Sequence, residues 1–224
     1  AYMVENSVVV VGEPGAVKQT TYALMLHGGF DPSNSVVIRG KNRVSDYGSE
    51  ELKKYDAVVL VQGSNPGDAG FKLQSFAESG GVVLPDVLNN KGTIDDKDIS
   101  EMFSGFNGSV KAMEDSKVSM LNFDEHKIEL DGQEGFLVYS EKFSVFDGWG
   151  VTDESGGEVS LLNANGMVSA VYLDGDEGSL MFRYAPSSFR IGAFISVVSL
   201  LGVLGYFGLL VYRKKWKIKK ETHE

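Results

Sequence analysis

Ser64 is a serine on a turn directly after a predicted strand, and a serine hydroxyl can act as a nucleophile. It belongs to Gly63-Ser64-Asn65-Pro66, which follows the apolar, β-branched run 57–61, a predicted strand. A serine nucleophile on such a turn needs a base within hydrogen-bond reach. The chain has no cysteine and three histidines, none of which the sequence places beside Ser64: His27, His126 and His223. We therefore expect no catalytic residue in this chain.

A second turn, Gly12-Glu13-Pro14-Gly15, lies between a predicted strand and a predicted helix. Dinucleotide-binding proteins place a glycine-rich turn at this point, but its spacing is G-x-G-x-x-G. The spacing here differs, and the carboxylate of Glu13 would repel a phosphate. The sequence favours a tight structural turn, with no cofactor-binding residue and no cofactor.

Two acidic segments, Asp95-Asp96-Lys97-Asp98 and Asp174-Gly175-Asp176-Glu177-Gly178, raise the question of a calcium site. Calcium requires several oxygen ligands, and neither segment has the alternating spacing and terminal glutamate of an EF-hand loop. The second segment is better interpreted as a solvated turn. We expect no metal ligands.

Glycans could interact with this chain in two ways. Asn107-Gly108-Ser109 is an N-x-S sequon, so Asn107 is a candidate glycan acceptor. Trp149 and Phe146 could stack on a sugar, although burial in a core is the commoner fate of such rings. A glycan therefore stays among the candidate partners. Nucleic acid does not, because the formal net charge is -10.

Alternating strand and helix signals occupy the first part of the chain, residues 1–100. Apolar strand runs at 7–11, 35–38, 57–61 and 82–84 alternate with helix patterns at 17–26, 49–55 and 68–79. This alternation predicts a parallel sheet with helices on both faces. The polar segment 89–105 is predicted to be a connection.

Period-two alternation without a helix signal follows in residues 101–188. Apolar side chains recur at every second position, as in Phe136/Val138 and Leu180/Phe182/Tyr184, and turn pairs such as Asn165-Gly166 separate the runs. This pattern predicts a small antiparallel β-sandwich or barrel.

A membrane span is predicted for residues 189–212. The stretch Ile191–Tyr212 has 22 residues without a charge, and about 20 apolar residues suffice to cross a bilayer as a helix. Residues 213–224 then hold six Lys/Arg and two Glu, whereas the rest of the chain holds 15 Lys/Arg and 29 Asp/Glu. The positive-inside rule predicts a basic cytoplasmic tail and an ectodomain outside the cell membrane.

Small residues recur through this span and suggest that it packs against other helices. Gly192 and Ser196 form a small-xxx-small pair, and further small residues follow at every third position: Ser199, Gly202, Gly205 and Gly208. Close packing at small residues drives helix association in lipid. The expected partners are the lipid bilayer and transmembrane helices of the same polypeptide or of a complex.

Part of the chain resembles a known family. The elements Asp147-Gly148-Trp149, Asn163-Ala164-Asn165-Gly166 and Phe182-Arg183-Tyr184-Ala185-Pro186-Ser187-Ser188-Phe189-Arg190 are similar to the C-terminal β-module of YfhO-like membrane proteins and related GT-C-type glycosyltransferases. The similarity covers residues 135–200. The proline that the family has before Gly148 and the basic residue after Trp149 are missing.

The preceding region, with its turn Phe76-Ala77-Glu78-Ser79-Gly80-Gly81-Val82, resembles a class I glutamine amidotransferase-like, flavodoxin-like domain. Together these resemblances imply a flavodoxin-like α/β domain, a β-sandwich and a last transmembrane helix. The chain would be a non-catalytic extracytoplasmic part of a glycosyltransferase-like membrane protein, with any transferase activity elsewhere in that protein. The alternative is a single-pass accessory subunit whose signal peptide preceded Ala1. An ectodomain enzyme is disfavoured by the missing catalytic residues.

Overall fold

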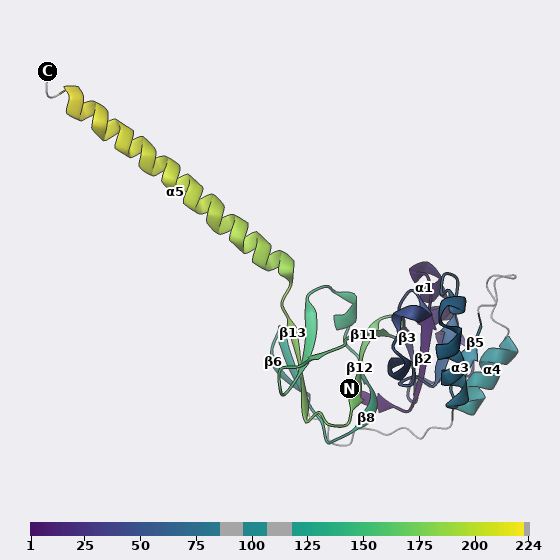
Figure 1. Cartoon of the computed structure of the whole chain (residues 1–224). Helices are drawn as coiled ribbons and strands as arrows, with labels where there is room; N and C mark the ends of the chain where they lie inside the picture. The colour runs from purple at the N-terminus through teal and green to yellow at the C-terminus, as the bar shows by residue number, and fades with distance from the viewer. Residues whose placement is uncertain (86–95, 107–117, 222–224) are drawn as a thin grey trace. The chain divides into compact units, whose positions relative to one another are not determined.

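The computed structural model describes residues 1–85, 96–106 and 118–221. Contacts divide the chain into two compact units, Ala1–Tyr184 and Ala185–Glu224. Within the described residues, the first unit contains two β-sheets and four α-helices, and the second contains one α-helix (Figure 1).

Sheet A is a mixed sheet of eight strands in the order β1-β8-β12-β11-β3-β2-β4-β5. Its parallel half consists of β3 (Ser35–Arg39), β2 (Asn6–Val11), β4 (Ala57–Leu60) and β5 (Val82–Leu84). Its antiparallel half consists of β1 (Tyr2–Val4), β8 (Glu134–Tyr139), β12 (Val168–Asp174) and β11 (Leu162–Ala164). Strands β2, β3 and β4 are buried on both faces except for Arg39, as their continuous apolar runs require.

Helices cover both faces of the parallel half. Val8 and Val10 of β2 contact α1 (Pro14–Leu26) and α4 (Asp96–Gly105). Val9 and Val11 point to the opposite face, where α2 (Ser49–Leu52) and α3 (Gly70–Glu78) contribute Leu52 and Phe76 to the core. Short 3₁₀ helices occur at Val44–Asp46, Pro66–Ala69 and Phe143–Val145.

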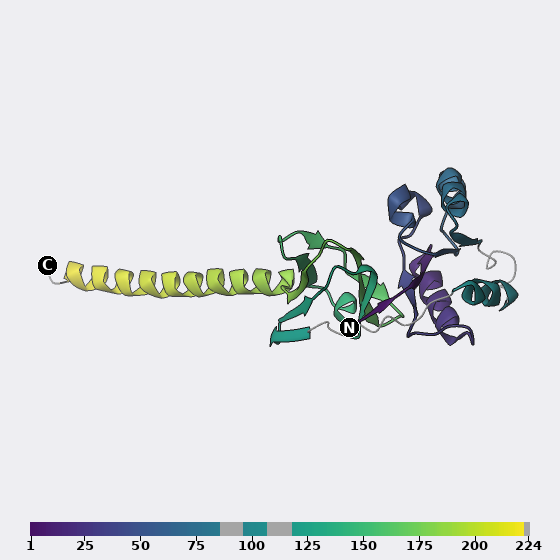
Figure 2. The ribbon, with the colours of Figure 1, turned by 90° about the horizontal axis from the view of Figure 1, so that it is seen from below.

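Sheet B covers one face of the antiparallel half of sheet A. Its five strands lie in the order β10-β9-β13-β7-β6. The core between the sheets combines Leu137 of β8 and Val171 of β12 with Ile128 and Phe182 of sheet B. The strands of sheet B are β10 (Glu158–Val159), β9 (Trp149–Asp153), β13 (Ser179–Tyr184), β7 (Glu125–Glu129) and β6 (Val118–Asn122). Figures 1 and 2 show sheet B at one end of the Ala1–Tyr184 unit and helices α1, α3 and α4 at the other.

The predicted flavodoxin-like α/β domain with a parallel sheet is wrong. The expected parallel strands and their helices form, but the sheet does not end at β3. Strands β11, β12 and β8, which come from the region predicted to be a separate sandwich, continue it as one mixed and largely antiparallel sheet. Without β11, the backbone groups along the edge of β3 would lack hydrogen-bond partners, and the buried side chains beside them would lose their cover. Pairing of β11 with β3 provides both the partners and the cover.

The segment predicted to be a polar connection contains helix α4 instead. Ile99, Met102 and Phe103 of this helix are buried against the parallel half of sheet A. Their spacing of three and four residues is that of one helix face, a signal that the surrounding Asp and Lys residues obscure.

Asn165 joins the two halves of sheet A. Strand β11 pairs with β3 through Ala164 and Ile38. The next residue, Asn165, donates its backbone N–H to the Val37 carbonyl at 2.8 Å, and its side-chain Oδ1 accepts the Val37 N–H at 2.9 Å. Asn165 has a φ of 44°, in the left-handed region that Asn tolerates better than most residues. One asparagine thus satisfies both backbone groups of Val37 where β11 ends.

We predict that Asn165→Gly lowers the free energy of unfolding by about 1–3 kcal/mol, since the buried Val37 N–H loses its acceptor. Asn165→Ala should cost roughly 1 kcal/mol more, because alanine is strained at a positive φ. Asn163→Ala is the matched control, since the buried Oδ1 of Asn163 has no partner and its Nδ2 donates only a long bond of 3.4 Å to Ser144 Oγ. Urea unfolding of the full chain in mild detergent measures these values. Equal losses at positions 163 and 165 would contradict the assignment.

Candidate functional site

The carboxyl ends of β2, β3 and β4 meet at one edge of sheet A, where α/β proteins commonly bind ligands. Here the loops that follow these three strands form hydrogen bonds with one another instead. The Gly12 N–H donates to the Lys41 carbonyl at 3.2 Å and the Glu13 N–H to the Gln62 carbonyl at 2.7 Å. The Val44 N–H donates to the Ser64 carbonyl at 3.1 Å. These three backbone donors are therefore bonded within the protein instead of facing a ligand.

Gly12 confirms the structural interpretation of its turn. Its φ is 149°, and a Cβ at this position would lie 2.6 Å from the Gln62 carbonyl oxygen and 2.6 Å from Val61 Cγ2. Only glycine lets the loop after β2 approach the loop after β4 this closely.

Ser64 is buried at this edge, and the two histidines that the structure describes lie elsewhere. The His27 ring stacks on Phe103 of α4 with 5.7 Å between centroids. His126 lies in sheet B, where its Nδ1 is 2.9 Å from the Tyr139 hydroxyl. His223 lies outside the described residues. His27 Nε2 also lies 3.4 Å from Ser100 Oγ of α4, so within the described ranges neither histidine pairs with Ser64.

The acidic segment at 174–178 forms a turn. The Glu177 carboxylate accepts the N–H groups of Asp174 at 3.3 Å and Gly175 at 3.1 Å. Neighbouring carboxylates act in the same way: Glu154 accepts the Gly178 N–H at 3.0 Å, and hydrogen bonds lower the pKa of Glu154. No cluster of three candidate metal ligands occurs among the residues that the structure describes. Asp95 of the other acidic segment lies outside them, as does Asn107, the candidate glycan acceptor.

The aromatic residues of sheet B form a packed cluster. Trp149 stacks on Phe143 with 3.7 Å between ring centroids, and Phe143 contacts His126 and Phe182. One face of the Trp149 indole is therefore covered by protein, whereas Phe146 is exposed. Trp149 also lies against Tyr184, with 5.3 Å between ring centroids, so its ring is part of this cluster.

Two surface pockets of about 570 and 620 Å³ lie at the amino ends of the parallel strands. Asp56 lines both. Its carboxylate accepts hydrogen bonds from the Ser7 N–H at 2.7 Å and the Ser7 hydroxyl at 2.9 Å. These bonds connect β2 to the loop before β4. These pockets lie at the edge opposite to the one where parallel sheets usually bind ligands.

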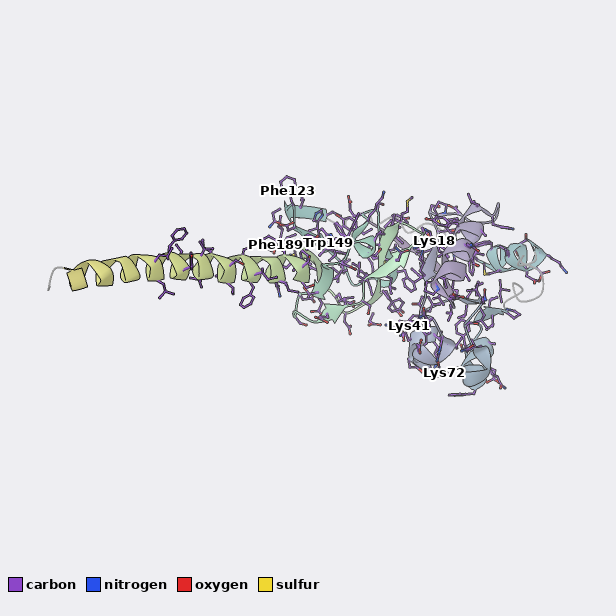
Figure 3. All side chains as sticks on the ribbon, turned by 90° about the horizontal axis from the view of Figure 1, so that it is seen from above. Lys18, Lys41, Lys72, Phe123, Trp149 and Phe189 are labelled. Atoms are coloured by element: carbon purple, nitrogen blue, oxygen red, sulfur yellow. The ribbon has the colours of Figure 1, made fainter. Side chains whose placement is uncertain are left out.

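Two labelled lysines in Figure 3, Lys41 and Lys72, belong to a polar network around Tyr47. Lys41 Nζ lies 2.7 Å from the Glu51 carboxylate, and Lys72 Nζ donates to the Tyr47 carbonyl at 2.5 Å and the Ser45 carbonyl at 3.2 Å. Both ammonium groups therefore bind oxygen atoms of the same unit. The sequence does not predict this network, because Lys72 is 25 residues from Tyr47 and the residues involved form no motif.

The feature with the clearest external role is α5 (Ser187–Glu221). Its segment Ser187–Leu210 has a mean hydropathy of 2.2 over an 18-residue window, and 0% of that window is buried. A core helix of a soluble protein would be buried, and a signal sequence would lie near the N-terminus. Length and composition therefore make this segment a candidate membrane span.

The six small residues predicted to pack against other helices all lie on α5. At about 100° per residue, positions 192, 196 and 199 share an arc of about 60°. Gly202, Gly205 and Gly208 each advance about 60° further around the axis. Ser196 donates its hydroxyl to the Gly192 carbonyl at 2.9 Å, so this polar group is satisfied within the helix. A Cβ at any of the four glycines would meet nothing within 4 Å, leaving room for another helix.

Comparison with protein-family models and with curated proteins finds no match. The YfhO-like and amidotransferase-like resemblances therefore stay predictions based on the motifs alone.

We predict a pH dependence from Tyr47, whose hydroxyl accepts the Lys41 N–H at 2.7 Å. Burial raises the pKa of Tyr47 to about 12, although the Lys41 hydrogen bond opposes this rise and Glu51 and Asp46 add to it. Because the folded-state pKa exceeds the unfolded one, the contribution of Tyr47 to stability is complete below pH 10 and declines toward pH 12.

At pH 11 the loss from this single group should be roughly 1 kcal/mol relative to pH 8. Urea unfolding of the wild type and of Tyr47→Phe at both pH values isolates it. The variant should lose less stability over this interval, and parallel losses in the two proteins would refute the prediction.

Proposed function

We propose that this chain is a non-catalytic extracytoplasmic domain that α5 anchors in the cell membrane. The observation that carries the proposal is the unburied apolar surface of Ser187–Leu210. An isolated helix with this composition would be unstable in water and is stable in a bilayer. The loops at the carboxyl edge of sheet A form hydrogen bonds with one another, which supports a non-catalytic role.

The distribution of charge supports the orientation. Six Lys/Arg follow the span within residues 213–224, and Arg190 is the one basic residue just before Ile191. Basic residues are retained on the cytoplasmic side, so the β-rich unit lies outside the cell.

The glycines of α5 support a role in association. A simple anchor needs only apolar residues, whereas small residues let helix backbones approach closely. We propose that α5 docks on other transmembrane helices, which on the motif resemblance belong to a glycosyltransferase-like membrane protein. The alternative, a single-pass accessory subunit, uses the same small residues toward a partner subunit.

The topology predicts a pattern of protease sensitivity. Protease added to sealed right-side-out vesicles should digest residues 1–184 and spare an epitope fused after Glu224. Immunoblotting with antibodies against each end measures this, and detergent-permeabilised vesicles, in which both ends should be digested, are the control. A protected β-rich unit with a cleaved tail would invert the topology.

The docking role predicts that Gly202→Leu combined with Gly205→Leu separates the chain from its membrane partners in mild detergent. Co-purification should fall by a factor of ten or more, as expected when about 1.4 kcal/mol or more of packing is lost. Val203→Leu combined with Leu204→Ile is the control, because it changes neighbouring apolar residues without filling a small position. Unchanged co-purification of the glycine variant, with an unchanged melting temperature, would make α5 a simple tether.

A further inference from the structure

The turn between β6 and β7 exposes a phenylalanine at the end of sheet B that leads to α5. Phe123 occupies this turn and is 91% exposed (Figure 3). Turns usually hold Gly, Asn, Asp or Ser, so a large apolar ring here is unusual. Met120 and Leu121, at the end of β6 next to the turn, are also exposed, at 65% and 54%.

The turn holds Phe123 in a fixed position. Asn122 Oδ1 accepts the Asp124 N–H at 2.8 Å, and Asn122 Nδ2 donates to the Glu125 carboxylate at 3.1 Å. These bonds fix the backbone on both sides of Phe123 without covering its ring. A turn whose backbone is already ordered loses less conformational entropy when it binds than a free loop does.

Two bonds attach the turn to the last residues of β13. The Tyr184 N–H donates to the Asp124 carbonyl at 2.9 Å, and Arg183 Nε donates to the Glu125 carboxylate at 2.7 Å. Tyr184 is separated from Ser187, the first residue of α5, only by Ala185 and Pro186. The chain between Tyr184 and Ser187 can therefore span at most about 11 Å.

We infer that the β6–β7 turn is a second membrane contact, with Phe123, Leu121 and Met120 inserted at the interface of the bilayer that α5 crosses. This inference rests on the proposed membrane anchoring. The short connection brings the turn close to the membrane surface, where aromatic residues are favoured. The charge of Glu125 is paired with Arg183, and Asp124 adds a further negative charge beside Phe123, so the lipid it fits is zwitterionic rather than anionic.

Because the chain contains no cysteine, one introduced cysteine provides a specific labelling site. The full-length Phe123→Cys variant, labelled with an environment-sensitive nitrobenzoxadiazole dye, is reconstituted into phosphatidylcholine vesicles. A fraction of the lipids carries a nitroxide near the headgroup end of the acyl chain. We expect a blue-shifted emission and at least a twofold quenching by the nitroxide lipid.

Two further variants serve as controls. Ser155→Cys places the label in the β9–β10 turn at the opposite end of sheet B, since Asp153 pairs with Leu180 whereas Trp149 pairs with Tyr184. This label should be neither shifted nor quenched. Leu201→Cys places it inside the apolar segment of α5 and should be shifted, which tests the anchoring itself.

The outcomes separate the inference from the proposed function. A shifted label at 201 together with an unshifted, unquenched label at 123 would overturn the membrane contact and retain the anchor. A label at 123 that shifts without lipid quenching, and only at high protein density, would indicate contact with another protein and also overturn it. An unshifted label at 201 would contradict the proposed anchoring.

Discussion

The pairing of β11 with β3 is the interaction on which the rest of the β-rich unit depends. It rests on one strand-pair position, Ala164 with Ile38, and on the two hydrogen bonds between Asn165 and Val37. Arg39 adds a hydrogen bond to the Gly166 carbonyl at 3.0 Å. These few contacts convert a four-stranded parallel sheet into an eight-stranded mixed one. A buried backbone group without a hydrogen-bond partner lowers stability. The Asn165 side chain supplies that partner to the Val37 N–H at the point where β11 ends.

Joining the two halves produces one apolar face that runs the whole width of sheet A. Val9 of the parallel half and Val138 and Ala170 of the antiparallel half belong to the same buried cluster. Tyr55, from the loop before β4, stacks on Phe136 of β8 with 5.4 Å between ring centroids. The opposite face is divided, with α1 and α4 over the parallel strands and sheet B over the antiparallel strands. Sheet B therefore has a fixed place, and the strand that leads to α5 is held within it.

The polar and apolar groups of this protein are used in contrasting ways. Glu177, Asp153 and the carbonyl-binding Lys72 all bond to groups of the same unit. Exposed apolar side chains occur along α5 and at the β6–β7 turn, and also at Leu26, Phe71 and Phe146. The β6–β7 turn is bonded to Tyr184 of β13, the strand that precedes α5.

The sequence by itself determined the local elements and the candidate span. Continuous β-branched runs gave β2, β3 and β4, period-two alternation gave strands such as β8 and β13, and 22 uncharged residues marked the apolar part of α5. These features follow from contacts between residues near one another in the chain. The tertiary structure decided that β8, β11 and β12 share a sheet with the strands before residue 85, and that the polar segment ending at Gly105 folds as α4. It also decided that Ser64 faces no histidine within the described residues. Such outcomes depend on which buried edges and faces meet in space, and Val37 and Asn165 are 128 residues apart. Local periodicity carries no information about a partner at that separation, so only the folded chain shows that Asn165 completes the sheet.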